Sequence, residues 1–283
     1  TLSNSATKCW GYNKYGSLAL GNVNYRGDAA NEMGDLLPAI NFGTGRSPTK
    51  LAGGLEFMCA LLDNASIKCW GRSFYGQLGY ENTNSIGDTA LEVGDGVAAV
   101  NIGTGKTAVD IAASYYNVCA ILNDSTLKCW GRNNNGQLGQ GNATQLGDGA
   151  GEMGDALLPI QLGTGFTPSK VWLSRYSTCV MSSGGVVKCF GLNSTGQLLV
   201  GSTTTIGSAG GQMGNALAAA NFGTGVAVTN ISMGYYSGCV LTSIGRIKCW
   251  GSAANGGLLN ASTTAHQGDI GGEVGDGLPF VNH

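Results

Sequence analysis

Eight of the nine cysteines form four pairs with one spacing, and such pairs can form disulfide bonds. The two members of a pair lie ten positions apart, and the residues between them centre on turn-forming sequences such as DNA, NDS, SGG and SIG. In a β-hairpin centred on such a turn, the two cysteines face each other at a Cα separation that a disulfide can span. The pairs are Cys59/Cys69, Cys119/Cys129, Cys179/Cys189 and Cys239/Cys249.

A second pairing scheme joins neighbouring pairs instead, for example Cys9 with Cys59 and Cys69 with Cys119. The hairpin scheme leaves Cys9 over, and we then expect Cys9 to bridge to a cysteine outside this chain. The second scheme leaves Cys249 over. Both schemes predict an oxidising compartment, because the chain has no metal-binding Cys-x-x-Cys pair that would give the thiols another role.

Acceptor sequences for N-linked glycans accompany the cysteines. The first lies between two paired cysteines, at the tip of the expected hairpin, where a glycan has room in solvent. Together with the cysteines, these sequences predict secretion through a glycosylating pathway. The six acceptor residues are Asn64, Asn123, Asn142, Asn193, Asn230 and Asn260.

Acidic residues recur in a motif that could bind a cation. One copy replaces all three positions together, with Ser208, Gln212 and Asn215, which suggests that the three side chains share one environment. That environment is either a calcium-type site or a set of backbone N–H groups that order a long loop. We favour the loop, and predict no metal and no cofactor. The motif holds Asp28, Glu32, Asp35, Asp88, Glu92, Asp95, Asp148, Glu152, Asp155, Asp269, Glu273 and Asp276.

The sequence contains few candidate catalytic residues. The two histidines, His266 and His283, fall outside the recurring pattern and have no nucleophile or carboxylate partner in it, so neither a Ser-His-Asp triad nor a zinc site is indicated. The many Gly-x-Gly strings recur in loops and do not indicate a dinucleotide site. The sequence therefore predicts that the protein is not an enzyme.

The elements that position these side chains repeat every 60 residues. KCWG or KCFG begins at positions 8, 68, 128, 188 and 248, and GTG recurs at the same period. Each repeat holds about four short, Gly-bounded strands, which cannot bury a two-faced sheet alone, so neighbouring repeats must stack. We therefore expect an all-β propeller, with residues 1–283 forming a single domain or a fragment of one.

Composition limits the partners. With 49 glycines and 42% hydrophobic residues, the chain has many tight turns and is not disordered. Charged residues make up 11%, with a net charge of −2, which argues against a nucleic acid partner. The chain has no apolar run of about 18 residues, so no membrane-spanning helix is predicted.

Two aromatic series follow the repeat. The first is expected to fill the space between blades, with the stems of the preceding lysines along the rings: Trp10, Trp70, Trp130, Phe190 and Trp250. The second lies at the connection that leads into the first cysteine strand, where equivalent side chains gather on one face of a propeller and could bind protein or glycan. It comprises Tyr115, Tyr116, Arg175, Tyr176, Tyr235 and Tyr236.

The segment KCWGRNNNGQLGQG at 128–141 resembles a repeat of the regulator of chromosome condensation family. Its blades pair a C-A-L strand, here CALL at 59–62 and CAIL at 119–122, with a W-G-x-N-x-x-G-Q-L-G segment. The resemblance implies a β-propeller, commonly of seven blades. The 283 residues hold about five blades' worth of chain, so we expect a piece of a larger propeller.

The resemblance carries no specific activity to this chain. Family repeats usually place a histidine just before C-A-L, where this chain has Phe57, Asn117, Ser177 and Ser237, so exchange-factor activity is not expected. The first hypothesis is a secreted binding or adhesion module, and the second is a subunit of an extracellular fibre that assembles from copies of itself. Because the architecture includes a secreted bacterial inhibitor of β-lactamase, enzyme inhibition is a third.

Overall fold

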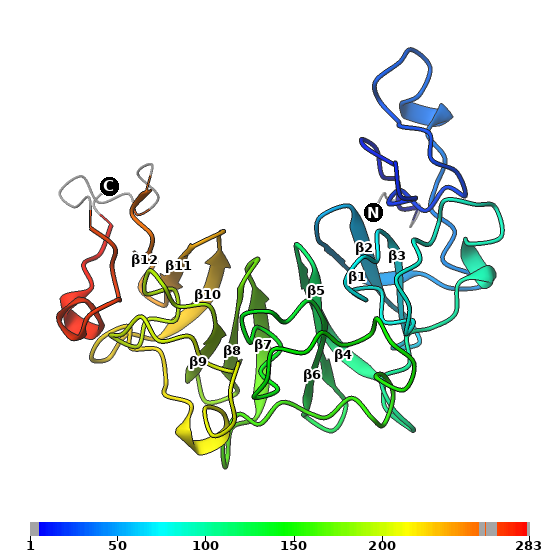
Figure 1. Ribbon diagram of the computed structural model, residues 1–283. Helices are drawn as coiled ribbons and strands as arrows, with labels where there is room; N and C mark the ends of the chain where they lie inside the picture. Colours follow the sequence, from blue (N-terminus) through cyan, green and yellow to red (C-terminus); the bar gives the residue numbers. More distant parts are fainter. Residues whose placement is uncertain (1–5, 255–257, 259–264, 282–283) are drawn as a thin grey trace. The chain divides into compact units, whose positions relative to one another are not determined.

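The computed structural model describes residues 6–254, 258 and 265–281 and is all-β, as predicted. Its strands form four antiparallel three-stranded sheets in chain order (Figure 1). The strands are β1 Pro48–Gly53, β2 Phe57–Leu62, β3 Ile67–Gly71, β4 Ala108–Ser114, β5 Asn117–Leu122, β6 Leu127–Gly131, β7 Pro168–Leu173, β8 Ser177–Ser182, β9 Val187–Gly191, β10 Val228–Met233, β11 Ser237–Thr242 and β12 Ile247–Gly251. Short 3-10 turns are η1 Gly34–Leu36, η2 Gly94–Gly96, η3 Gly214–Ala216, η5 Gly271–Glu273 and η6 Gly275–Gly277.

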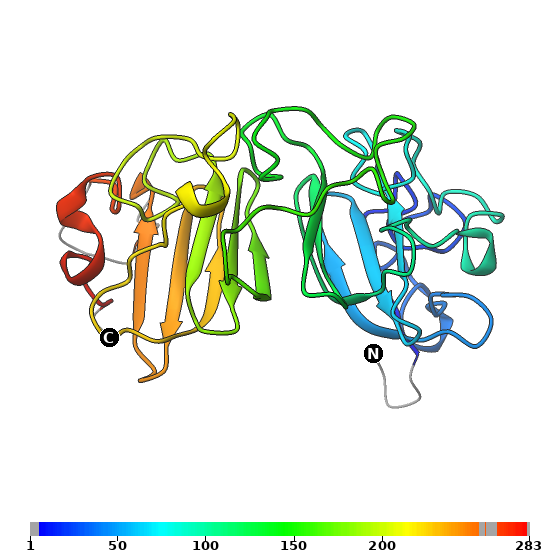
Figure 2. The same ribbon diagram turned by 90° about the horizontal axis from the view of Figure 1, so that it is seen from below.

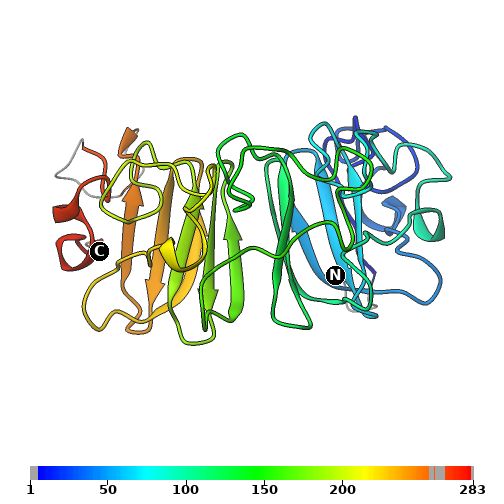
Figure 3. The same cartoon turned by 60° about the horizontal axis from the view of Figure 1, so that its bottom comes forward.

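The chain divides into two compact units. Unit 1 comprises residues 1–124, 130–132 and 145–158, and unit 2 comprises residues 125–129, 133–144 and 159–283, so β6 contributes to both. Within unit 2, the sheets β7-β8-β9 and β10-β11-β12 lie side by side (Figure 2 and Figure 3) and share one apolar core. Each unit thus buries the faces of its sheets by stacking neighbouring repeats, as the period of 60 predicts.

The hairpin disulfide scheme is confirmed. Cys59 lies directly opposite Cys69 in the β2–β3 register, with a Cα separation of 4.1 Å, and the two are bonded. The same bond joins Cys179 to Cys189 and Cys239 to Cys249, and Cys119 and Cys129 are also disulfide-bonded. Cys9 is a free thiol, as that scheme requires. The alternative pairing between neighbouring repeats is wrong, because the short hairpin turns place each pair face to face.

The fourth strand of each repeat is shorter than predicted. After β3 the chain turns away and returns only for one antiparallel bridge, between Gly71 and Ile86 in the first complete copy. Gly131 with Leu146, and Gly191 with Ile206, repeat that bridge. Further along the chain, β9 and β12 each receive a second isolated bridge, between Lys188 and Ala219 and between Lys248 and Phe280.

Three tryptophans of the first aromatic series join consecutive repeats, as predicted, whereas Trp10 is exposed. The Nε1–H of Trp70 donates to the carbonyl of Ser17 at 3.0 Å, and Trp130 and Trp250 donate in the same way to Gln77 and Gln197. Each acceptor lies 53 residues before its donor, in the preceding repeat. The rings are almost fully buried, so each indole fills the space between sheets and pairs a buried carbonyl.

Repeat four has phenylalanine instead of tryptophan and keeps this hydrogen bond by another route. Phe190 has no N–H, and the equivalent carbonyl, of Gln137, accepts instead from the hydroxyl of Thr178 at 2.9 Å. Thr178 lies opposite Phe190 in the β8–β9 register. The two residues together replace the single indole of the other repeats.

Thr178→Val is therefore expected to lower the free energy of unfolding by about 1–3 kcal/mol, because it leaves the buried carbonyl of Gln137 without its donor. Urea unfolding followed by circular dichroism measures the change. Adding Phe190→Trp to the same chain supplies an N–H where the other repeats have one and is expected to recover part of the loss. Equal stability of Thr178→Val and the wild type would contradict this role.

A close approach between repeats explains the recurring G-Q-L and G-D sequences. Gly76, at φ +71°, lies so near Gly147 that a Cβ atom there would be 2.3 Å from its carbonyl carbon. Gly136 meets Gly207, and Gly196 meets Gly268, in the same manner. The glycines are needed both for their backbone angle and for the space they leave.

Candidate functional site

The glutamate of the acidic motif orders its own loop. One carboxylate oxygen of Glu32 accepts hydrogen bonds from the backbone N–H groups of Gly27, Asp28 and Ala29, at 2.9 to 3.2 Å. These bonds, with that of Ala29 the strongest, lower the pKa of Glu32. Glu152 caps Gly147 and Gly149 in the same way.

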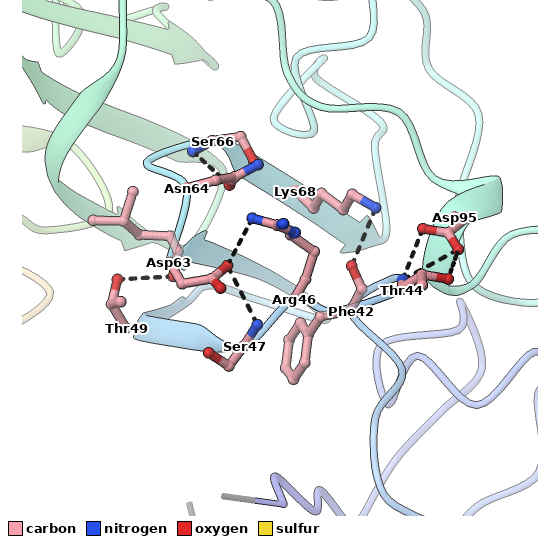
Figure 4. A network of polar contacts seen from close by, with 11 residues as sticks. Phe42, Thr44, Arg46, Ser47, Thr49, Asp63, Asn64, Ser66, Lys68 and Asp95 are labelled. Atoms are coloured by element: carbon pink, nitrogen blue, oxygen red, sulfur yellow. Dashed lines mark hydrogen bonds and ion pairs between the residues drawn. The ribbon is translucent and has the colours of Figure 1, made fainter.

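The third acid of the motif ties each loop to the preceding repeat. Asp95 accepts from the hydroxyl and the backbone N–H of Thr44, in the GTG turn 51 residues earlier (Figure 4). Both bonds lower the pKa of Asp95, and the bond from the Thr44 hydroxyl has the larger effect. Asp155 with Thr104, and Asp276 with Thr224, repeat the contact.

The first two acids of a motif stay together, whereas the third is separate: the side chains of Asp88 and Glu92 share a hydrogen bond, as do those of Asp269 and Glu273. Repeat four keeps both hydrogen-bonding roles without charge: Gln212 accepts from Gly207 and Ala209, and Asn215 accepts from Thr164 at 2.7 Å. Amides can replace carboxylates here because backbone N–H groups need only an acceptor oxygen. Within the described residues, no group of three or more His, Cys, Asp and Glu side chains is placed to hold a metal ion.

The lysine before the second cysteine of a hairpin holds two loops together in three repeats, at Lys68, Lys188 and Lys248. The ammonium of Lys68 donates to the carbonyl of Phe42 (Figure 4) and to that of Gly94, and Lys248 donates to those of Phe222 and Gly275. Burial lowers the pKa of Lys68, Lys188 and Lys248. The sequence predicted only that the lysine stems pack on the rings, and it missed these carbonyls because they come from loops about 26 residues away.

The predicted glycan acceptors differ in exposure. Asn64, Asn123, Asn142 and Asn230 are exposed, and Asn64 lies at the β2–β3 turn, as expected. Asn193 is wrong as an acceptor: it is 0% exposed, and its Nδ2, the atom that would carry the glycan, donates to the carbonyl of Ser202. Its loop needs that amide to satisfy buried backbone groups. Asn260 lies outside the described residues.

Tyrosines of the second aromatic series gather in unit 2. Tyr176 follows β7, and Tyr235 and Tyr236 follow β10, at the connections predicted to lead into the cysteine strands. The hydroxyls of Tyr176 and Tyr235 lie 3.3 Å apart, and the ring of Tyr176 stacks on that of Tyr236 at 5.7 Å. Arg175 lies 5.0 Å from the centre of the Tyr176 ring and 4.7 Å from that of Tyr235. We call these four residues the tyrosine cluster.

The tyrosine cluster is partly open to solvent. Tyr236 is exposed, and Arg175, Tyr176 and Tyr235 are half-buried. Burial raises the pKa of Tyr176 to about 12, whereas the hydrogen bond from Tyr176 lowers the pKa of Tyr235. Mutual stacking fixes these side chains before any partner arrives, which reduces the entropy lost on binding.

Tyr115 and Tyr116 lie in unit 1. Tyr116 is buried and packs against Tyr75, and the guanidinium of Arg132 lies 5.0 Å from the centre of the Tyr75 ring. Arg72 covers the ring of Phe74 at 4.1 Å. These arginines and ring partners were not predicted from the sequence. Both arginines directly follow a KCWG sequence, and this shared position was the signal that could have identified them.

His266 has a structural role. Its Nδ1 accepts from the backbone N–H of Ala253 at 3.3 Å, which ties the returning loop to the end of β12. His283 lies outside the described residues. In the part of the chain that the structure describes, no helix is both long and apolar enough to cross a membrane.

Comparison with known proteins agrees with this geometry. Residues 49–77, 108–137 and 228–256 match the regulator of chromosome condensation (RCC1) repeat, and each match spans the first two strands of a sheet, the KCWG sequence and the loop after it.

Solved structures show the same fold. Human WBSCR16 aligns with a TM-score of 0.67 and 16% identity over 98% of this chain and 64% of its own. Yeast RCC1 (Prp20) in complex with Kap60 aligns at 0.66 and 14%, over 99% and 58%. Prp20p of Saccharomyces cerevisiae aligns at 0.67 and 14%, over 99% and 60%. The chain thus spans about three fifths of the length of these proteins. It has the fold of their β-propellers, and three of its segments match the regulator of chromosome condensation repeat.

Proposed function

We propose that this chain is a non-catalytic, protein-binding module of an oxidising, extracellular compartment, and that it contacts its partner through the tyrosine cluster. The main observation behind this proposal is the tyrosine cluster, whose side chains already pack against one another without a partner: Arg175, Tyr176, Tyr235 and Tyr236. Tyr and Arg are also the residues that dominate the energetics of protein interfaces. Similar structures are those of protein binders: yeast RCC1 is bound to Kap60, and Prp20p has binding properties to Gsp1p and histones. The hairpin disulfides support the compartment.

The test screens the intact chain against an array of secreted proteins and, in parallel, against a glycan array. For a protein that binds, Arg175→Ala and Tyr236→Ala are each expected to raise Kd about 30-fold, the effect of losing an interface hot spot. Tyr25→Ala is the matched control, because Tyr25 is an exposed tyrosine of unit 1 that stacks on Tyr12. Binding that resists both cluster variants would contradict this surface, and binding to glycans alone would contradict a protein partner.

A further inference from the structure

Unit 2 contains an open pocket of 320 Å³ at the turn between β11 and β12. Its walls come from three segments that the repeat brings together: the residues after the GTG turn, the hairpin turn, and the stretch that follows the acidic motif. The tyrosine cluster lies beside the start of β11, whereas the pocket adjoins its end, so the two sites occupy opposite ends of this strand.

The pocket exists because this repeat lacks a large side chain at one position. In the first copy, Arg46 occupies the place and pairs with Asp63 (Figure 4). In the next copy, Lys106 pairs with Asp124. The third copy has Phe166, whose ring lies below the Lys188 ammonium.

The fourth copy has the short Val226 at this position, and Ser243 and Ile244 stand where the acids of the first two copies are. Phe280 and Ile244, which is 71% exposed, complete the apolar wall. Loss of the ion pair and of the aromatic ring thus opens an apolar hollow of a size that small-molecule sites have.

The pocket lining holds one cation and one anion, and a second cation lies next to a lining residue. Lys248, 2% exposed, lines the pocket and donates to the carbonyls of Phe222 and Gly275, which uses two of the three N–H groups of its ammonium. The guanidinium of Arg246 lies 3.9 Å from the centre of the ring of Phe280, a lining residue. The carboxylate of Asp276 is held by Thr224. These three groups together carry a net charge of +1, which favours a monoanion.

We propose that this pocket binds a small carboxylic acid with an apolar ring or tail. The tail contacts Val226, Ile244 and Phe280, and the carboxylate is attracted by Lys248 and Arg246. Phenylacetate, with ten non-hydrogen atoms, has the size and charge of such a ligand. For a ligand this small we expect a Kd of about 1 mM or tighter.

The experiment titrates the intact chain with phenylacetate and with its neutral analogue phenylacetamide, followed by saturation-transfer NMR. Phenylacetate is expected to bind at least tenfold more tightly than the amide. Val226→Phe, which copies the ring of the third repeat, is expected to weaken phenylacetate at least tenfold. Leu91→Phe, at an exposed position of unit 1, is the matched control and should bind as the wild type does.

Arg246→Gln keeps the pocket open and removes the positive charge next to Phe280. This variant is expected to weaken the binding of phenylacetate several-fold and to leave the binding of phenylacetamide unchanged. It therefore tests the proposal even if Val226→Phe does not fold. Three outcomes would each overturn the proposal: no binding of phenylacetate up to about 20 mM, equal binding of acid and amide, or binding that neither Val226→Phe nor Arg246→Gln changes.

Discussion

Replacing Cys59 and Cys69 together with alanine is expected to lower the free energy of unfolding by about 2–3 kcal/mol. The bridge closes a ten-residue separation, and in the chain-entropy model a loop of that size restricts the unfolded state by this amount. Both side chains are 0% exposed, so the lost sulfur packing adds to the effect. Urea unfolding of the oxidised proteins, followed by circular dichroism, measures it.

Cys9→Ala is the matched control, because it removes one sulfur and no bridge. It is expected to leave stability within about 0.5 kcal/mol of the wild type. Treating the wild type with a reductant should lower its stability further than the double variant does, since all four bridges are then opened. If the double variant were as stable as Cys9→Ala, the β2–β3 bridge would have no stabilising role.

Gly76→Ala is expected to cost about 2–4 kcal/mol. Alanine at φ +71° has a backbone penalty of about 1 kcal/mol, and its Cβ would lie 2.2 Å from the backbone nitrogen of Asp148. Backbone atoms cannot move aside as a flexible side chain can, so the two repeats must shift apart. The measurement is again the urea unfolding curve.

Gly105→Ala separates the two causes. Gly105 has nearly the same angle, φ +67°, and a Cβ there would have nothing within 4 Å. We expect this control to cost only the backbone penalty of about 1 kcal/mol. Equal losses for the two variants would show that the approach of Gly76 to the next repeat does not hold the repeats together.

Local features of the fold could be predicted from the sequence. The ten-residue spacing of Cys59 and Cys69, with a turn sequence between them, fixes which residues face each other in a hairpin. The periodic recurrence of the tryptophans predicts packing residues, because packing between repeats has the same period. In both cases the information lies within one repeat or in its exact recurrence, so one sequence suffices.

Contacts between loops of different repeats could not be predicted in the same way. The pairing of Asp95 with Thr44 spans 51 residues and depends on how far one sheet is shifted along the next. Thr178 and Phe190 look like two unrelated departures from the repeat until their register is known. The burial of Asn193 also follows from its loop, because the acceptor sequence itself says nothing about accessibility.

For the tyrosine series, the positions could be predicted from the repeat, but the grouping of the side chains could not. Tyr176 and Tyr235 meet because β7 and β10 are equivalent strands of neighbouring sheets, so their connections end together. Within unit 1, Tyr116 is buried and packs against Tyr75. A linear pattern cannot predict the burial of one tyrosine and the exposure of another, because both keep the same period.

Mapping the disulfides of the native protein by mass spectrometry of unreduced peptides tests the central claim most directly. We predict four linked peptide pairs, Cys59–Cys69, Cys119–Cys129, Cys179–Cys189 and Cys239–Cys249, and alkylation of Cys9 alone in the 283-residue chain. Links between neighbouring repeats, or alkylation of all nine cysteines, would contradict both the disulfide-bonded sheets and the oxidising compartment inferred from them.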